Sequence, residues 1–287
     1  MCLPVQRRWI RICGGKKLIN RLANQGGHGL PEPQRRSPTR AADAPGRPRS
    51  TLGALEPTGT IEVYRGKNVQ GYTLLDSEEK MSLKQATQIF EKHEALKRPK
   101  IMAQEIIAHI LHPRPHLRFI GAYDAQGVLS VNTVSNIFTL NPDIEKFPLK
   151  LFLGILNSTV CSWFADRFLY CNATRTMHLG DYQLAVLRMV PKKRWKGETA
   201  KAIVRRVDER IDIGPPSSEV ELKDITKYAK ILEVQINEMV GRMFGLSKEP
   251  IESIDKAMGT KSLIETGRSG KNLANKQQES AIKKATR

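Results

Sequence analysis

The sequence predicts an α+β protein in which a small mixed β-sheet is backed by helices, between basic ends that are disordered. Three observations predict this fold. Short segments of alternating apolar and polar residues, which are typical of strands, recur between residues 61 and 138. Longer segments with apolar residues at helical spacing lie at residues 149–170 and 221–244. The two ends of the chain are rich in polar and basic residues and show neither pattern.

The positive charge of the chain is concentrated in its two ends. The formal net charge is +18 over 287 residues, of which residues 1–57 carry +8 and residues 256–287 carry +6. Arg, Pro and Gly dominate residues 1–57, and this composition buries too little apolar surface to offset the entropy lost on folding. We therefore predict a disordered flank at 1–57, a folded domain at 58–258 and a disordered Lys-rich tail at 259–287.

The sequence also indicates a compartment. No apolar run is long enough to cross a bilayer, since the best one, Leu151–Leu156, is followed at once by Asn157 and Ser158. Four cysteines without CxxC spacing favour a reduced chain. The first residues are acid-poor and slightly amphipathic, which leaves a transit-type peptide open, but they lack the continuous apolar stretch of a secretory signal. We predict a cytoplasmic protein with no membrane partner.

The first predicted elements are two strands and a helix. Ile61–Tyr64 alternates as a strand and leads into a basic turn, Arg65–Asn68. Residues 77–96 favour a helix, because Ser77 can cap it, two glutamates follow in the first turn and apolar residues share one face. A proline ends this helix, and Ile101–Ile107 is the next predicted strand.

Three histidines follow this strand closely, at His109, His112 and His116. Such a group suggests a metal site, because imidazole is a common zinc ligand. However, Pro113 and Pro115 exclude the regular helix that would align the three rings, and no Cys or carboxylate completes a ligand set. The sequence therefore predicts no metal in this chain.

The remaining elements are a hairpin and several helices. Residues 117–123 and 128–138 alternate as strands around a short turn, and we predict that they pair with each other. A buried core helix is predicted from Pro148 to about residue 170. An amphipathic helix follows at 221–244 and ends at Gly245, a residue suited to a helix C-terminus; a short acidic helix comes next.

Several of these segments, taken in order, resemble one protein family. Gly66–Tyr72 is similar to the segment that opens the TaqI-like C-terminal specificity domain of adenine-specific DNA methyltransferases. Leu156–Ser158 matches a step of that family which we expect to serve packing or a backbone hydrogen bond. Arg188–Pro191 resembles its closing turn, with one proline where relatives often have two, and Phe244–Ser247 resembles its end. The resemblance extends from residue 61 to about residue 255.

This resemblance implies recognition of a short duplex DNA sequence and presentation of the adenine to a catalytic domain, in a restriction-modification setting. Methyl transfer to adenine needs a Gly-containing loop for S-adenosylmethionine and an Asn/Asp-Pro-Pro-aromatic tetrapeptide for the flipped base. Asn141–Asp143 and Gly214–Ser217 do not supply that tetrapeptide. We therefore expect no catalytic residue and no cofactor in this chain, with S-adenosylmethionine bound only by a catalytic partner. The resemblance places Glu105 and Asp124 in the sheet scaffold.

Two groups of candidate DNA-binding residues come from the strand region. Cationic and amide side chains in the basic turn suit phosphate binding, although a charged surface turn has the same composition. On the predicted strand 128–138, polar residues alternate with apolar ones and share one face, where an amide can pair with the edge of adenine. An exposed strand face carries the same residue types. The candidates are Arg65, Lys67, Asn68, Ser130, Asn132 and Asn136.

A third group lies later in the chain, where basic residues surround one aromatic side chain. Charge combined with an aromatic ring suits binding to a nucleic-acid backbone, and a solvated loop with a buried Trp is the competing interpretation. This group is Lys192, Lys193, Arg194, Trp195 and Lys196. Weaker candidates of the same kind are Arg175, His178 and Tyr182.

We therefore predict the sequence-specific DNA recognition module of a restriction-modification type adenine DNA methyltransferase, without the catalytic domain in this chain. Its expected partners are double-stranded DNA and a separate methyltransferase catalytic polypeptide. Two alternatives stay open. One is a component of an active, S-adenosylmethionine-dependent adenine-N6 methyltransferase. The other is a structural or partner-binding remnant that uses the helix at 221–244.

Overall fold

The computed structural model of the chain describes residues 10–12, 55, 58–139, 149–173, 176–187, 190, 194–214, 219–259 and 263. The flank and tail predicted to be disordered, 1–57 and 259–287, lie largely outside these residues. They depart from the prediction at two places that the structure describes. Ile10–Ile12 form strand β1, which pairs with a strand of the central sheet. Leu263 is completely buried in the main core.

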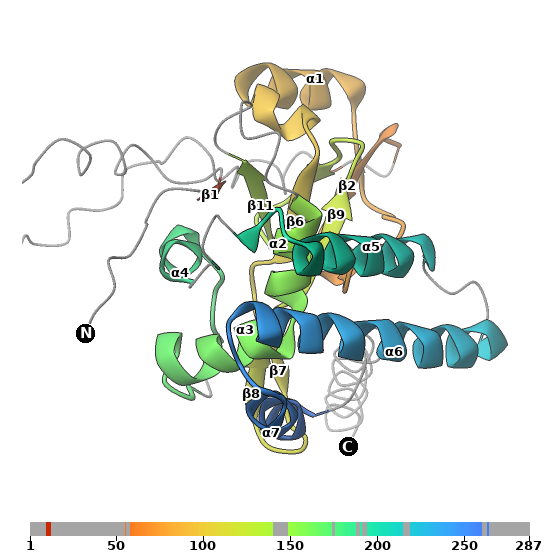
Figure 1. The fold of residues 1–287 in the computed structure, drawn as a ribbon. Coiled ribbons are helices and arrows are strands. Elements are labelled where there is room, and N and C mark those ends of the chain that lie inside the picture. Colours follow the sequence, from red (N-terminus) through yellow and green to blue (C-terminus); the bar gives the residue numbers. More distant parts are fainter. Residues whose placement is uncertain are drawn as a thin grey trace, which may run out of the picture.

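A four-stranded antiparallel sheet forms the centre of the molecule, in the order β1–β11–β6–β9 (Figure 1). Its other strands are Lys100–Gln104 (β6), Gly121–Asp124 (β9) and Val134–Thr139 (β11). Strand β6 contains three consecutive apolar residues that are completely buried, Ile101, Met102 and Ala103. A strand that is apolar on both faces suits the interior of a sheet, and β6 therefore lies between its neighbours.

The hairpin predicted between residues 117–123 and 128–138 does not form. Strands β9 and β11 lie on opposite sides of β6, so that Met102 faces Ala122 on one side and Asn136 on the other. The predicted second strand is also interrupted, because Leu129–Ser130 forms a separate strand, β10, that pairs elsewhere. The prediction was wrong because the alternation of a strand does not determine its partner.

The side chain of Asp124 explains why the chain leaves the sheet after β9. Its oxygens accept hydrogen bonds from the backbone N–H groups of three following residues, Gln126, Gly127 and Val128, at 2.8–2.9 Å. The ammonium group of Lys100 binds the same carboxylate and is itself completely buried. Burial lowers the pKa of Lys100, and Asp124 opposes this shift. Asp124 is therefore a scaffold residue, as the resemblance implies.

A small mixed sheet lies beside the central one and carries its own core. Strand β10 runs parallel to Ile61–Tyr64 (β2), which pairs antiparallel with Lys80–Met81 (β5). Helix α1 (Leu83–Lys92) packs against this sheet, and the buried residues of this second core are Val63, Met81, Ala86, Leu129 and Val131. The α+β fold class with a small mixed sheet is confirmed.

The remaining strands form two short hairpins: Val69–Gln70 (β3) with Thr73–Leu74 (β4), and Ala108–Ile110 (β7) with His116–Arg118 (β8).

Helix α1 spans Leu83–Lys92 and begins later than predicted. Its cap is Ser82, whose Oγ accepts a hydrogen bond from the Gln85 N–H at 3.4 Å, while the Gln85 side chain accepts one from the Ser82 N–H at 3.3 Å. Ser77, the predicted cap, is buried and donates to the Val63 carbonyl at 2.6 Å. The helix cannot begin at Ser77 because strand β5 follows that residue.

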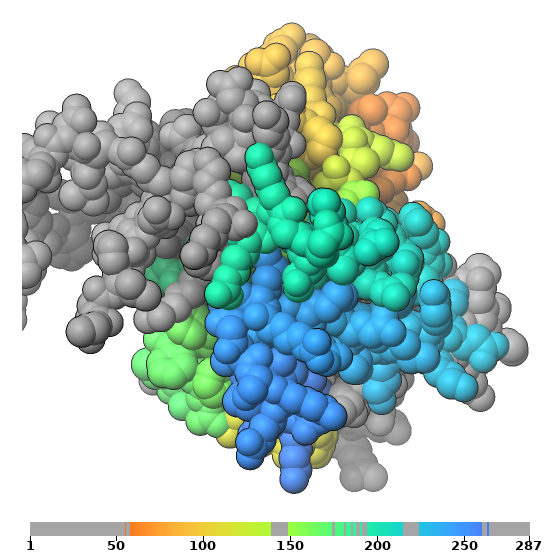
Figure 2. Space-filling view, viewed as in Figure 1, coloured from red at the N-terminus to blue at the C-terminus, as the bar shows by residue number. Residues whose placement is uncertain are grey.

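Helices in layers cover the central sheet (Figure 1). Helix α2 (Leu149–Asn157) packs on β6 and β9, α5 (Glu198–Asp212) packs on α2, and α6 (Glu219–Met243) packs on α5. In the space-filling view, α5 and α6 form much of the front face (Figure 2). The predicted continuous helix from 148 to 170 is interrupted at Ser158, which caps a second helix. The remaining helical segments are Thr159–Phe164 (α3), the π-helix Ala165–Leu169, Asp181–Val186 (α4), Lys248–Met258 (α7) and two 3₁₀ turns, Gly66–Asn68 and Glu94–Lys97.

Two close contacts hold α2 in place. A Cβ atom added at Gly154 would lie 2.9 Å from Ile203 Cγ2 and 3.0 Å from Val207 Cγ2, so glycine permits the close approach of α5. Asn157 is 1% exposed, and its amide bonds both backbone groups of Gly121: the N–H donates to Oδ1 at 2.8 Å, and Nδ2 donates to the carbonyl at 2.9 Å. The predicted backbone hydrogen bond of Asn157 is therefore confirmed. Among the described residues, no helix is long and apolar enough to span a membrane.

Candidate nucleic-acid interface

The basic turn, residues 65–68, is built around Asn68. This side chain is 5% exposed; its Oδ1 accepts from the Arg65 N–H at 2.9 Å, and its Nδ2 donates to the Asp76 carbonyl at 2.8 Å. Both polar atoms of the amide are therefore used inside the protein, and Asn68 shapes the turn. Unlike the two cations of the turn, it offers no free group to a phosphate.

The two cations of the turn are exposed but share one carboxylate. Glu79 binds the guanidinium of Arg65, and its other oxygen lies 3.4 Å from Lys67 Nζ. The side chains of Arg65 and Lys67 remain 37% and 45% exposed, so a ligand can reach them. Because one anion faces two cations, the group keeps a net charge of +1. Burial raises the pKa of the neighbouring Tyr64 to about 12, an effect reinforced by its hydrogen bond to Glu62.

The basic turn lies directly against the segment that carries the predicted polar residues. The Gly66 N–H donates to Thr133 Oγ1 at 3.0 Å, and the Val131 N–H donates to the Tyr64 carbonyl at 3.0 Å. A Cβ atom at Gly66 would lie 2.9 Å from the Thr133 carbonyl oxygen, so the turn can approach this closely only with glycine. The structure thus brings together two candidate groups that are more than sixty residues apart in the chain.

The three polar candidates of this segment are half-buried. Ser130 belongs to β10 and Asn136 to β11, and the Asn136 amide donates to Ser130 Oγ at 2.8 Å. Asn132 lies in the turn between the two strands. The Oδ1 atoms of Asn132 and Asn136 are buried, and neither has a hydrogen-bond partner. Bidentate pairing of Asn136 with adenine therefore requires its amide to leave Ser130, whereas Asn132 stands next to the exposed turn.

Backbone contacts extend this surface to residues that were weak candidates or not candidates. The Glu105 N–H donates to the Thr133 carbonyl at 3.0 Å, and the Leu179 N–H donates to the Glu105 carbonyl at 2.7 Å. The Glu105 carboxylate lies 3.7 Å from His178 Nδ1. Tyr182 lies four residues after His178, in α4, and is 73% exposed. We call this surface the rim and define it as Arg65, Lys67, Glu105, Asn132, Thr133, His178 and Tyr182.

Thr133 was missed by sequence reasoning although it connects the two halves of the rim. Its hydroxyl meets the basic turn, and its carbonyl meets Glu105. Both contacts are long-range, so neither periodicity nor a local motif reveals them. The sequence points to Thr133 only indirectly, since this residue follows Asn132 in the polar segment that is predicted to bind DNA.

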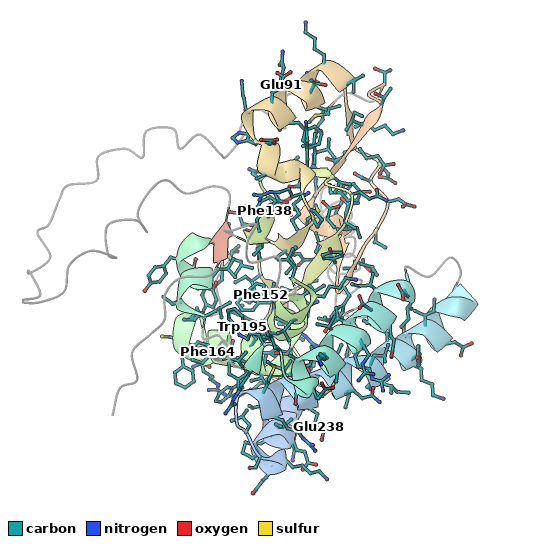
Figure 3. The ribbon with its side chains drawn as sticks, turned by 45° about the horizontal axis from the view of Figure 1, so that its top comes forward. Glu91, Phe138, Phe152, Phe164, Trp195 and Glu238 are labelled. Atoms are coloured by element: carbon teal, nitrogen blue, oxygen red, sulfur yellow. The ribbon has the colours of Figure 1, made fainter. Side chains whose placement is uncertain are left out.

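The third group of candidates does not form a stacking platform. Trp195 is 6% exposed, and its indole N–H donates to the Val190 carbonyl at 2.8 Å, so the ring belongs to the main core (Figure 3). The competing interpretation, a buried Trp in a basic loop, describes it correctly. Arg194 is exposed, but its guanidinium donates to the Met243 carbonyl at 2.6 Å, and Lys196 is exposed. The other candidates, Arg175, Lys192 and Lys193, lie outside the described residues.

The three clustered histidines do not converge. His109 and His112 are exposed, whereas His116 is 3% exposed and its Nδ1 lies 2.8 Å from the Arg114 carbonyl oxygen. Burial lowers the pKa of His116, which favours its neutral form. Within the part of the chain that the structure describes, no group of three His, Cys, Asp or Glu residues is arranged to hold a metal ion.

Comparison with known proteins identifies the segment that contains the rim. Residues 61–188 match the model of the TaqI-like C-terminal specificity domain, so the whole rim lies inside the match. No curated protein matches the chain. The domain occurs as the DNA-recognition part of methyltransferase-type systems. The resemblance predicted from the sequence is therefore confirmed for residues 61–188, which are similar to the TaqI-like C-terminal specificity domain.

Proposed function

We propose that this chain is the sequence-specific DNA recognition module of a restriction-modification type adenine DNA methyltransferase, acting in the cytoplasm. The observation that carries the proposal is that residues 61–188, the matched segment, contain the rim, in which the two partly exposed cations of the basic turn contact the polar segment that carries Asn132. In this proposal the rim faces duplex DNA.

In this proposal the residues of the rim have two roles: some bind phosphates and position the protein on the DNA, and others contact the edges of bases. Arg65 and Lys67 bind phosphate oxygens, which fixes the position of the protein on the duplex without selecting a sequence. Asn132 reads a base edge, because an amide offers a donor and an acceptor side by side, as adenine requires in the major groove. Asn132 supports this assignment by its place in the turn between β10 and β11, next to the basic turn. Tyr182, in α4, adds an exposed ring to the rim.

Methyl transfer belongs, in this proposal, to a separate catalytic polypeptide that binds S-adenosylmethionine and holds the flipped adenine. Residues 1–287 contain no Asn/Asp-Pro-Pro-aromatic tetrapeptide of the kind that holds a flipped adenine. Incubation of the purified chain with labelled S-adenosylmethionine and mixed-sequence duplex DNA tests this division of labour. We expect no methyl incorporation by the chain alone; incorporation would assign catalysis to this chain.

The recognition proposal is tested by fluorescence anisotropy with duplex DNA at several salt concentrations. We expect affinity to fall steeply with salt, and the slope of log K against log salt to decrease by about 0.9 for each phosphate contact removed. Arg65→Ala and Lys67→Ala remove one contact each. Lys201→Ala is the matched control, because Lys201 is an exposed lysine on α5, away from the rim. Binding that ignores salt, or equal slopes in all four proteins, would contradict the proposal.

A second candidate function, partner binding, is favoured by one observation on α6. Three apolar residues of this helix are about half exposed: Tyr228 at 51%, Ile231 at 47% and Val234 at 48%. Their spacing places them along one side of the helix. Light scattering with and without DNA separates the two functions, because recognition predicts an increase in mass on adding DNA and a partner-binding remnant predicts none.

A further inference from the structure

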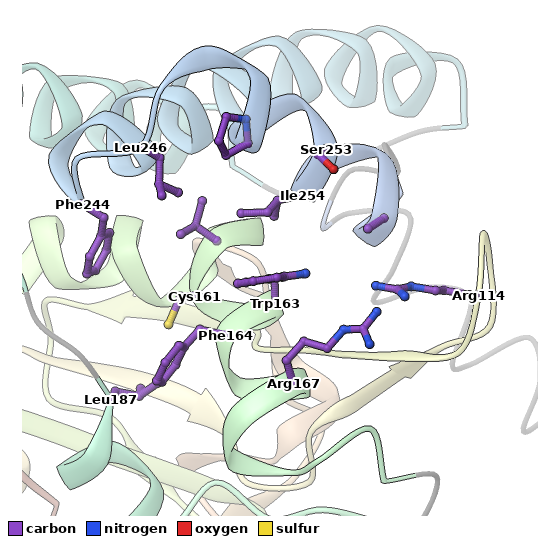
Figure 4. Close-up of a pocket in the computed structure, with 13 residues that line it drawn as sticks. Arg114, Cys161, Trp163, Phe164, Arg167, Leu187, Phe244, Leu246, Ser253 and Ile254 are labelled. Carbon is purple, nitrogen blue, oxygen red and sulfur yellow. The ribbon is translucent and has the colours of Figure 1, made fainter.

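A cavity of about 550 Å³ lies between helices α3 and α7. Its lining is mostly apolar and comes from α3, the π-helix that follows it, α7 and the turn before α7 (Figure 4). Its volume falls in the range of roughly 300–1,000 Å³ that is usual for small-molecule sites. The DNA-recognition proposal gives this cavity no role.

The two ends of the cavity differ in character. In Figure 4, Phe164, Leu187 and Phe244 lie at one end of the cavity, and Arg114 and Arg167 lie at the other. Among the described residues, no carboxylate forms an ion pair with either guanidinium. Two cations that share one end of an apolar cavity attract an anion.

The fold holds both arginines in place. Arg114 lies in the loop between β7 and β8, and this loop packs against the end of α7, where a Cβ atom at Gly259 would lie 2.9 Å from Pro113 Cδ. The Leu117 N–H of β8 donates to Asp166 Oδ1 at 3.0 Å, which ties the strand to the residue before Arg167. These contacts bring the two guanidinium groups to the same end before any ligand is present.

The backbone around Arg167 is unusual. Ala165–Leu169 is a π-helix, closed by a hydrogen bond from the Tyr170 N–H to the Ala165 carbonyl at 2.9 Å. Single π-helical turns are rare and occur frequently at functional sites, because the extra residue changes the direction of the side chains. Here the segment carries Arg167 at the cavity mouth.

We propose that this cavity binds an amphipathic carboxylate with an unbranched apolar body, of the medium-chain fatty-acid class. The apolar body lies between α3 and α7 and reaches Phe164 and Phe244, and the carboxylate binds Arg114 and Arg167. A nucleobase fits less well, because the lining offers few polar groups to pair with its edges. A neutral apolar molecule fills the same space but leaves the two cations without an anion.

The test compares three ligands of equal chain length by isothermal titration calorimetry on the full chain: decanoate, decanol and decyltrimethylammonium. We expect decanoate to bind at least about tenfold more tightly than decanol, since only the carboxylate forms charge-assisted hydrogen bonds with the two guanidinium groups. Decyltrimethylammonium is expected to bind most weakly. Equal affinities for decanoate and decanol, or no binding of decanoate, would overturn the proposal.

Variants locate the site. Arg114→Ala and Arg167→Ala are each expected to weaken decanoate binding about tenfold and to leave decanol binding unchanged, which also shows that the cavity is intact. Ala257→Phe, which places a ring in the cavity from α7, is expected to abolish both. Arg205→Ala is the control, since Arg205 is exposed on α5 and does not line the cavity. Loss of decanoate binding in Arg205→Ala, or its retention in both other arginine variants, would place the anion elsewhere.

Discussion

Replacing Asn157 by leucine tests whether one buried amide joins the central sheet to its helical layer. Leucine has the same branched shape and the same number of side-chain heavy atoms, so the change removes hydrogen bonds without leaving a large cavity. The Gly121 N–H loses the acceptor it has at 2.8 Å, at a cost of about 1–3 kcal/mol. The Gly121 carbonyl keeps the Tyr72 N–H at 2.7 Å and loses only its second donor, at a cost of about 1 kcal/mol.

The expected loss for Asn157→Leu is therefore about 2–4 kcal/mol in the free energy of unfolding. At about 2–4 °C per kcal/mol for a domain of this size, the melting temperature falls by roughly 5–15 °C. Urea unfolding followed by circular dichroism measures the change. Gln88→Leu is the control, because Gln88 is an exposed amide on α1. A loss below about 0.5 kcal/mol would refute the assignment, since the two bonds would then contribute no more than a surface contact.

Three further predictions follow from other contacts. Glu79→Gln removes the carboxylate that faces the basic turn. Because Arg65 and Lys67 then lose an interaction with Glu79 of about 0.5–1 kcal/mol, we expect two- to fivefold tighter DNA binding in the anisotropy assay. Weaker binding would contradict this prediction. Lys100→Met leaves the buried Asp124 carboxylate without its cation, and urea unfolding is expected to show a loss of about 3–5 kcal/mol, whereas an unchanged midpoint would show that the pair is dispensable. Burial raises the pKa of the Cys161 thiol to about 12. Iodoacetamide at pH 8 should therefore label the exposed Cys171 and leave Cys161 unmodified until the protein unfolds, which mass spectrometry of peptides measures. Equal labelling rates for the two cysteines would contradict the burial of Cys161.

Local patterns predicted local structure well. Amphipathic spacing predicted α6, which spans Glu219–Met243 against a predicted 221–244, and Gly245 adopts the positive φ of 86° expected after a helix end. The family resemblance singled out Asn157, and its backbone hydrogen bonds are present. These features depend on neighbouring residues or on a short motif, and such information is contained in a single sequence.

Features that depend on distant residues were not predictable. The alternation of residues 128–138 could not reveal that β6 would lie between the two expected hairpin strands. Ser77 has the right chemistry for a helix cap, but strand β5 forms after it and moves the cap to Ser82. Trp195 has basic neighbours in sequence and apolar neighbours in space. For the rim, the chemistry of Arg65 was predictable, whereas its joining to Thr133 depends on how two sheets meet.

The separate core of the small mixed sheet has a consequence for dynamics. That core contains few buried side chains, and the basic turn follows directly from its central strand, β2. A unit with so little buried apolar surface opens at a lower free energy than the rest of the protein. Native-state hydrogen exchange should therefore show weaker protection in β2, β5 and α1 than in β6 and α2. In the proposed function, such subglobal opening would let the basic turn adjust its position on the DNA backbone while β6 keeps its place in the central sheet.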